Sequence, residues 1–139
     1  MSISVVYWSG TGNTQAMAEA VAEGIKATGQ EAELLEVGKA DAKTVAEEAA
    51  FALGCPAMGA EVLEESEMEP FVEELESYVS GKKILLFGSY GWGDGEWMRT
   101  WEETCKADGA VLACDSVLAN EAPDDDAVAA CQALGKALC

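Results

Sequence analysis

The sequence contains no histidine, and this absence removes several kinds of chemistry. Without an imidazole there is no Ser-His or Cys-His nucleophile pair and no His-ligated metal site. The five cysteines form no Cys-x-x-Cys pattern, so neither a zinc nor an iron–sulfur site is expected. Their odd number also argues against a disulfide framework. We expect reduced thiols, most of them buried as small hydrophobic side chains.

Basic residues are scarce. Only 8 Lys and Arg accompany 26 Asp and Glu, which gives a formal net charge of −18. Nucleic acids and anionic membrane surfaces are bound by clustered positive charge, so neither is an expected partner. The acidity favours a partner with a basic docking surface and a salt-sensitive encounter. An acidic surface that serves only solubility is the alternative.

Long apolar runs are also missing. No stretch approaches the length of a membrane span, and the N-terminus lacks the basic and then apolar pattern of a signal peptide. We therefore expect a cytoplasmic protein. Half of the 139 residues are apolar, which is enough to build one folded domain over residues 1–139 with a buried core.

What is present is a regular alternation of strand and helix patterns. Strands are predicted at 3–8, 31–37, 50–53, 82–87 and 110–118, and helices at 13–28, 41–48, about 70–81, 96–108 and from 124 onward. Five βα units predict an α/β fold, a doubly wound parallel sheet with helices on both faces. Ligands of such sheets bind at the carboxyl ends of the strands. With the strand order 2-1-3-4-5, the loops at 9–14, 54–61 and 88–95 lie on one rim.

The first of these loops has the composition of an anion site. The apolar run at 5–8 breaks into Ser-Gly-Thr-Gly-Asn-Thr at 9–14, just before a helix. Backbone N–H groups at a helix N-terminus, with hydroxyl and amide donors beside them, bind phosphate. The loop has no lysine, which excludes a nucleoside triphosphatase loop, and it lacks the GxGxxG spacing of a dinucleotide site. A phosphate monoester held by neutral donors is the favoured ligand. A polar turn without a ligand is the alternative.

The other two loops carry large apolar side chains. Met58 lies in one and Trp92 in the other, with glycines at 59, 91, 93 and 95. Surface loops rarely carry such residues unless they cover a ligand, and a flat apolar ring fits between an indole and a thioether. The glycines allow the backbone to approach that ring closely. Packing of either side chain onto the sheet is the alternative.

Three segments together resemble the short-chain flavodoxins of anaerobic bacteria, and the similarity covers essentially the whole chain. The segments are YWSGTGNT at 7–14, GCPAMGAEVLEESEMEPF at 54–71 and GKKILLFGSYGWGDGEWM at 81–98. The resemblance implies a flavodoxin-like three-layer sandwich with sheet order 2-1-3-4-5 and one non-covalently bound FMN. It also implies a monomeric, low-potential one-electron carrier that shuttles between the semiquinone and hydroquinone states and is not an enzyme. Its expected partners are redox enzymes with basic docking surfaces, of the kind that donate electrons to ferredoxin or accept them from it.

The same resemblance implies a set of FMN-binding positions. They are Trp8, Ser9, Gly10, Thr11, Gly12, Asn13, Thr14, Pro56, Ala57, Met58, Gly59, Ala60, Glu61, Ser89, Tyr90, Gly91, Trp92, Gly93 and Asn120. Ser9, Thr11, Asn13 and Thr14 match phosphate donors, and Trp8 flanks them.

Further roles follow from the same match. Met58 and Trp92 match the two side chains that cover the flavin. Gly59 matches a hinge whose carbonyl turns toward flavin N5, and Glu61 matches a carboxylate at the pyrimidine edge. Gly91 and Trp92 match backbone donors to N1 and O2.

Asn120 stands where a ribityl contact is expected. Two positions depart from the family pattern. Pro56 replaces a serine hydroxyl that some relatives place near the phosphate. Ala60 replaces a polar residue, so side-chain help in holding the turned peptide is not expected here.

Three other readings compete with an electron carrier. A flavin-dependent quinone or nitro reductase would need room for a nicotinamide and an acid–base residue, and neither is evident. A phosphorylated receiver domain would need an acidic cluster at the strand ends, where this chain has Tyr7, Trp8 and Pro56. A phosphate-binding module without redox chemistry is the third.

Overall fold

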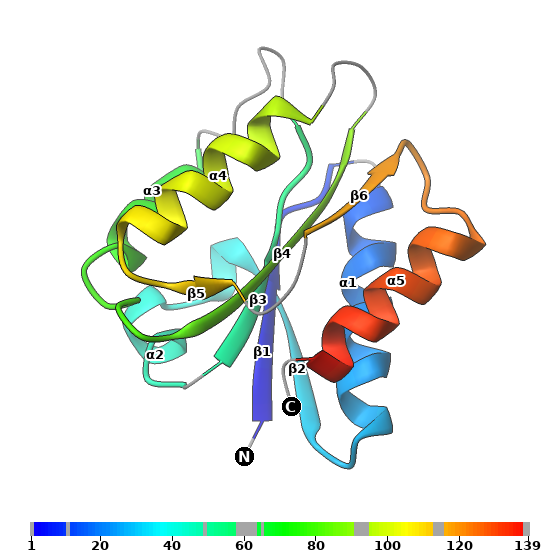
Figure 1. The fold of residues 1–139 in the computed structure, drawn as a ribbon, viewed down its shortest axis with the longest axis horizontal. Coiled ribbons are helices and arrows are strands. Elements are labelled where there is room, and N and C mark those ends of the chain that lie inside the picture. Colours follow the sequence, from blue (N-terminus) through cyan, green and yellow to red (C-terminus); the bar gives the residue numbers. More distant parts are fainter. Residues whose placement is uncertain are drawn as a thin grey trace.

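The computed structural model describes residues 2–10, 12–48, 50–57, 64, 66–90, 95–112 and 116–137. Within them the chain forms a parallel sheet with helices on both faces (Figure 1). In chain order the elements are β1 (Ser2–Tyr7), α1 (Asn13–Ala27), β2 (Glu31–Glu36), the 3-10 turn η1 (Val37–Lys39), α2 (Ala42–Val45), β3 (Ala50–Gly54), α3 (Met68–Leu75), β4 (Lys83–Tyr90), α4 (Glu96–Ala107), β5 (Val111–Leu112), β6 (Val117–Asn120) and α5 (Asp125–Ala137).

The sheet order is β2-β1-β3-β4-β5, which confirms the predicted order 2-1-3-4-5. The fifth strand differs from the prediction of one strand over 110–118. β5 and β6 each pair in parallel with β4, at Lys83↔Val111 and at Phe87↔Val117. Residues 113–115 lie outside the described residues. Ser116, the described residue just before β6, belongs to neither strand.

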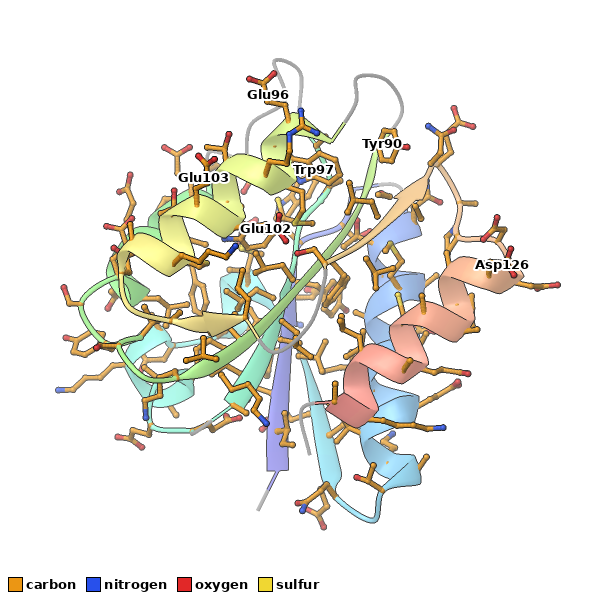
Figure 2. All side chains as sticks on the ribbon, in the orientation of Figure 1. Tyr90, Glu96, Trp97, Glu102, Glu103 and Asp126 are labelled. Atoms are coloured by element: carbon orange, nitrogen blue, oxygen red, sulfur yellow. The ribbon has the colours of Figure 1, made fainter. Side chains whose placement is uncertain are left out.

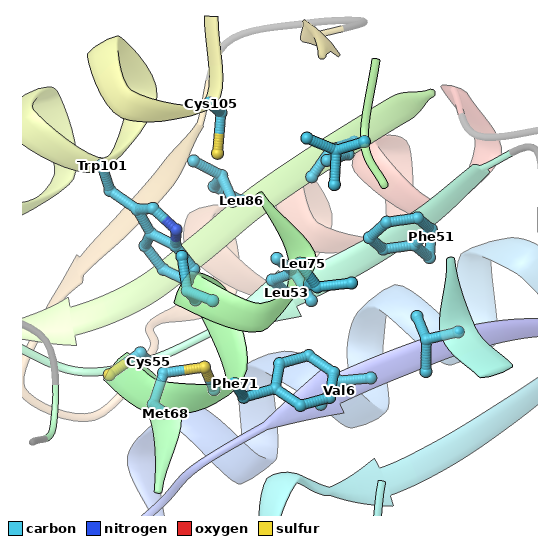
Figure 3. Close-up of a cluster of buried hydrophobic side chains, with 14 of the residues drawn as sticks. Val6, Phe51, Leu53, Cys55, Met68, Phe71, Leu75, Leu86, Trp101 and Cys105 are labelled. Atoms are coloured by element: carbon cyan, nitrogen blue, oxygen red, sulfur yellow. The ribbon is translucent and has the colours of Figure 1, made fainter. Parts of the chain in front are cut away.

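Successive side chains of the central strands divide the core in two, because strand residues alternate between faces. Val6, Leu53 and Leu86 face the cluster that packs under α2, α3 and α4 (Figure 3). Their neighbours Val5, Ala52 and Leu85 face the cluster under α1 and α5. Figure 1 shows the same division, with α1 and α5 on one side of the sheet and α3 and α4 on the other.

Helices α1 and α5 approach each other through glycine. A Cβ on Gly24 would overlap the carbonyl oxygen of Gln132, and a Cβ on Gly135 would overlap that of Val21. The side chain of Gln132 also donates to Glu23 at 3.0 Å across the two helices. Close backbone packing therefore holds α5 against α1.

Among the helices of the described residues, none is long and apolar enough to cross a membrane.

Candidate functional site

The carboxyl edge of the sheet continues its hydrogen bonding beyond the ends of the strands. This edge carries the segments that follow β1, β3, β4 and β6. The bonds are Trp8 N–H to Gly54 O at 3.0 Å, Cys55 N–H to Phe87 O at 3.1 Å, Ala57 N–H to Ser89 O at 3.0 Å and Glu121 N–H to Tyr90 O at 2.7 Å. The predicted rim therefore exists, and its first residues are held by the backbone.

The loop after β1 leads into α1, and the N-cap residue of this helix is a glycine, which has no side chain to cap it. Gly12 is the N-cap residue, with φ 94° and ψ −7°, a left-handed conformation that glycine adopts readily. The Ser9 hydroxyl accepts hydrogen bonds from the N–H groups of Gly12 at 3.0 Å and Gln15 at 3.3 Å. Within the described residues nothing accepts from the N–H groups of Asn13 and Thr14. The first turn also has no acidic side chain, so this helix end attracts an anion.

Thr14 joins this loop to the end of β4. Its hydroxyl lies 3.1 Å from the hydroxyl of Ser89, although the two residues are 75 positions apart in the chain. Both side chains are buried, at 1% and 4% exposure. One hydroxyl donates to the other, which leaves one further O–H that can donate to a ligand. Two predicted site residues, one in the first turn of α1 and one at the end of β4, are thus in contact.

The segment after β3 is built closely against β4. A Cβ on Gly54 would overlap the ring of Phe87, and a Cβ on Gly88 would overlap the carbonyl oxygen of Cys55. Burial raises the pKa of the Cys55 thiol to about 12; the hydrogen bond from the N–H of Glu64 lowers it and the negative charge of Glu64 raises it further. Cys55 is therefore a neutral thiol at physiological pH and neither a nucleophile nor a metal ligand.

Cys105 and Cys131 are likewise buried free thiols, and burial raises the pKa of each to about 12. The prediction of buried, reduced cysteines is confirmed for these two residues and for Cys55. Cys114 and Cys139 lie outside the described residues.

A buried carboxylate anchors the start of α3 just beyond this segment. Glu64 is 6% exposed, and its carboxylate accepts from the N–H groups of Ser66 at 2.8 Å, Glu67 at 2.7 Å and Met68 at 3.0 Å, and from the Ser66 hydroxyl. Burial raises the pKa of this carboxyl, but the hydrogen bonds outweigh burial and hold the pKa below its ordinary value. The N–H of Glu64 donates to the sulfur of Cys55 at 3.4 Å.

The ends of β4 and β6 complete the edge. Asn120 is paired with Tyr90 in the sheet register, and its side chain is exposed. Glu121 follows with φ 59°, a conformation that non-glycine residues rarely adopt and that clusters at functional sites. Tyr90 packs on Trp97 of α4, with ring centroids 5.7 Å apart (Figure 2).

A cavity of about 330 Å³ opens on the β2 side of the first loop. Ser9 and Trp8 line one side of it, and the acids Glu36 and Glu67 line the other. Lys39 is the one cation among the described lining residues, and its Nζ lies 3.8 Å from the carboxylate of Glu36. Two carboxylates make this cavity unsuitable for a phosphate.

The structure therefore brings together eleven residues of the predicted FMN set at one edge of the sheet. They are Trp8, Ser9, Gly10, Gly12, Asn13, Thr14, Pro56, Ala57, Ser89, Tyr90 and Asn120. The other eight predicted residues lie outside the described residues: Thr11, Met58, Gly59, Ala60, Glu61, Gly91, Trp92 and Gly93.

Four residues that support this edge were not singled out by sequence reasoning: Cys55, Glu64, Trp97 and Glu121. Cys55 and Trp97 are apolar and read as ordinary core. Glu64 stands three residues after Glu61 in an acidic run and reads as a solvated surface residue. The predicted helix begins at about 70, six residues further on, so the sequence carries no signal of a capping role; the start of α3 at Met68 brings its first N–H groups within reach of Glu64.

Comparison with known proteins decides the family. The flavodoxin family model matches residues 5–134. A flavodoxin of Clostridium beijerinckii is 48% identical over 123 residues, covering 88% of this chain and 89% of that protein. A flavodoxin of Megasphaera elsdenii is 44% identical over 135 residues, covering 97% and 96%. The chain belongs to the flavodoxin family.

The three-dimensional comparison agrees with this flavodoxin assignment. The solution structure of two-electron reduced Megasphaera elsdenii flavodoxin superposes with a TM-score of 0.90 at 43% identity, covering 99% of this chain and 98% of that one. The structure of an archaeal flavodoxin superposes with a TM-score of 0.86 at 29% identity, covering 99% and 96%. The flavodoxin-like fold expected from the sequence is therefore confirmed.

As a flavodoxin, the protein is an FMN-binding electron carrier and not an enzyme. The residues present fit the cofactor. The N-terminus of α1 offers backbone donors without a competing acid, and the Ser9, Thr14 and Ser89 hydroxyls stand around it. The reductase, receiver-domain and redox-free alternatives are not supported by the comparisons.

Proposed function

We propose that residues 1–139 form one FMN-binding domain in which the loop at 9–14 holds the phosphate. The observation that carries this assignment is the start of α1, where Gly12 is left-handed, the first turn has no acidic side chain, and the N–H groups of Asn13 and Thr14 have no acceptor among the described residues. The Ser9 hydroxyl, together with those of Thr14 and Ser89, adds neutral donors. Bound FMN supplies the one-electron chemistry. The residues of the chain hold the phosphate, orient the ring and set the charge around it.

The flavin ring lies between the segments that follow β3 and β4 in this proposal. Met58 and Trp92 cover its two faces, Gly59 supplies a carbonyl for N5, and Glu61 and Gly91 contact the pyrimidine side. All five lie outside the described residues. What supports the placement is that the described residues from which the two segments start, Cys55 to Ala57 and Tyr90, stand at the same edge as the loop at 9–14. We call these residues the roots of the two segments.

A low potential follows from the charge around the site. The proposed phosphate contacts contain no Lys or Arg, and the whole chain carries −18. One unit charge about 10 Å away, at an effective dielectric near 20, opposes an added negative charge by about 1.7 kcal/mol. For a one-electron couple this is about 70 mV. Because salt screens the exposed acids, only the nearest few contribute fully.

The expected partners are redox enzymes with basic docking surfaces, which this chain meets as a cytoplasmic monomer. Exposed carboxylates of Glu36, Glu67, Glu96 and Glu121 stand where elements begin or end along the carboxyl edge. They surround the place where the ring is proposed to lie, so a basic partner surface would be guided toward it.

Stepwise anaerobic reduction of the purified protein, followed by its visible spectrum, tests the proposal. Two separate one-electron steps are expected, the second at a low potential. A colourless protein that does not bind added FMN, or a single two-electron step, would contradict it.

Replacing Trp92 with alanine tests the ring position. The Trp92→Ala protein should bind FMN more weakly and show stronger flavin fluorescence, because the stacked indole is lost. Tyr78→Ala is the control, since Tyr78 is an aromatic side chain that is 44% exposed beyond the end of α3. Equal affinity in both variants would mean that Trp92 packs elsewhere.

A further inference from the structure

The indole of Trp97 lies beneath the carboxyl edge and contacts two of its segments. Trp97 is in the first turn of α4 and only 1% exposed. Its Nε1–H donates to the carbonyl oxygen of Cys55 at 3.1 Å. Its ring packs on that of Tyr90 at a centroid distance of 5.7 Å and an interplanar angle of 47° (Figure 2). One side chain of α4 thus contacts the segment after β3 and the end of β4.

The third contact comes from Gly88 in β4. A Cβ there would overlap the carbonyl oxygen of Cys55 and lie 3.1 Å from Cζ2 of Trp97. A side chain at this position would separate the carbonyl from the indole. Because Gly88 has no side chain, the segment after β3, strand β4 and helix α4 can pack closely at the buried hydrogen bond from Trp97 to Cys55.

We propose that Trp97 is a positioning residue for FMN, which holds the roots of the two ring-covering segments at a fixed separation. This inference rests on the proposed function, in which Met58 and Trp92 cover the ring. Cys55 stands three residues before Met58, and Tyr90 stands two residues before Trp92. A change in the relative position of Cys55 and Tyr90 is therefore carried into both segments. Trp97 itself contacts only their roots.

Trp101 supplies an internal comparison. It lies one turn later on the same helix and is 2% exposed, packed in the cluster that contains Leu75 and Leu86 (Figure 3). Among the described residues its Nε1–H has no hydrogen-bond partner. The two tryptophans share helix, burial and size, and differ in the hydrogen bond to Cys55.

The test replaces each tryptophan separately with benzothienylalanine, which keeps the bicyclic shape and carries sulfur in place of the N–H. At position 97 the carbonyl of Cys55 loses its buried donor. The affinity of the apoprotein for FMN should fall roughly tenfold, and the separation of the two one-electron potentials should change. At position 101 no hydrogen bond is lost, so affinity should stay within about twofold and the potentials should be unchanged.

A measurement on the native protein keeps the test open if the position 97 variant does not fold. Binding energies are reciprocal, so FMN that is favoured by the Trp97 hydrogen bond must in turn protect that bond. Exchange of the Trp97 indole N–H with solvent should be slower in the FMN-bound protein than in the apoprotein. The ratio of the exchange rate in the apoprotein to that in the FMN-bound protein should be smaller for the Trp101 indole N–H than for that of Trp97. Equal ratios at the two indoles would overturn the inference.

Two outcomes separate this inference from the proposed function. If Trp92→Ala weakens FMN binding while the position 97 variant keeps native affinity and potentials, Trp97 is only a core residue and the FMN site stands. If Trp92→Ala binds FMN as tightly as the native protein, the ring position itself is wrong and the role of Trp97 falls with it.

Discussion

Single residues decide how the carboxyl edge is held. Glu64 is the clearest case, because one buried carboxylate satisfies three backbone N–H groups at the start of α3 while its own N–H reaches Cys55. A helix start would otherwise leave these donors unpaired. The lowered pKa of Glu64 means that the charged form is favoured in the folded protein.

Glu64→Gln should therefore lower stability in a pH-dependent way. The carboxylate stabilises the fold above its unfolded pKa, near 4.5, and this contribution is lost as the pH falls through the lower folded pKa. At pH 7 the variant should lose about 1–3 kcal/mol of unfolding free energy, and the loss should shrink at acid pH. Urea unfolding of the apoprotein across pH 3–7 measures it.

Asp41→Asn is the matched control for Glu64→Gln. Asp41 also caps a helix, because its carboxylate accepts a hydrogen bond from the N–H of Thr44 at 3.3 Å. Unlike Glu64, it is exposed and caps only the short α2. The Asp41→Asn protein should lose at most about 1 kcal/mol of unfolding free energy. Parallel pH curves for the native protein and Glu64→Gln would show that the Glu64 charge does not contribute.

A second residue-scale prediction concerns Gly59, which lies outside the described residues. If its peptide turns to present a carbonyl to the flavin, a threonine there opposes the turned form by roughly 1–2 kcal/mol. Gly59→Thr should bring the two one-electron potentials closer together by tens of millivolts. Redox titration measures the separation, and an unchanged value argues against the turn.

At the scale of elements, contacts between strands and between helices position the segments at the carboxyl edge of the sheet. β1, β3 and β4 are paired side by side, so the segments that follow them start next to one another. On the far face, α5 lies against α1, whose N-terminus is the proposed phosphate site. The packing of α5 therefore supports the helix that holds the cofactor.

Gly135→Ala should destabilise the protein even though alanine is the better helix former. In an exposed helix position the change would add about 0.5–1 kcal/mol of stability. Here the new methyl would overlap the carbonyl oxygen of Val21 and force α5 away from α1. We expect a net loss of about 1–3 kcal/mol in urea unfolding. Ala129→Gly, at an exposed position of α5, calibrates the propensity effect, and a more stable Gly135→Ala protein would show that the helices can separate freely.

At the scale of the whole molecule, the charge of −18 acts on the cofactor as well as on partners. Each nearby carboxylate opposes the addition of an electron, and salt reduces this effect because the Debye length falls from about 30 Å at 0.01 M to about 8 Å at 0.15 M. The second potential is therefore expected to depend on ionic strength.

Raising the ionic strength from 0.01 M to 0.5 M should make the second one-electron potential less negative by a few tens of millivolts. Spectroelectrochemistry of the FMN-bound protein measures the shift, with free FMN in the same buffers as control. A protein that shifts no more than free FMN would indicate that local contacts alone set the potential.

The sequence by itself determined the alternation of strands and helices, the phosphate-type loop without lysine and the family. These features are local: periodicity, glycine and hydroxyl content, and the occurrence of Met58 and Trp92 beside glycines can each be recognised in a short stretch of chain. Eleven of the predicted FMN residues meet at one edge because parallel strands end there together.

Only the tertiary structure decided which distant groups touch. Examples are the contact between the Thr14 and Ser89 hydroxyls and the hydrogen bond from Trp97 to Cys55, which join residues far apart in the chain. The pairing of both β5 and β6 with β4 is another. No local pattern distinguishes Trp97 from Trp101, since both are apolar and one helical turn apart. Their difference arises because the carbonyl of Cys55, just after the end of β3, accepts from the Trp97 indole, whereas the Trp101 N–H has no partner among the described residues. That outcome depends on how α4 packs across the sheet.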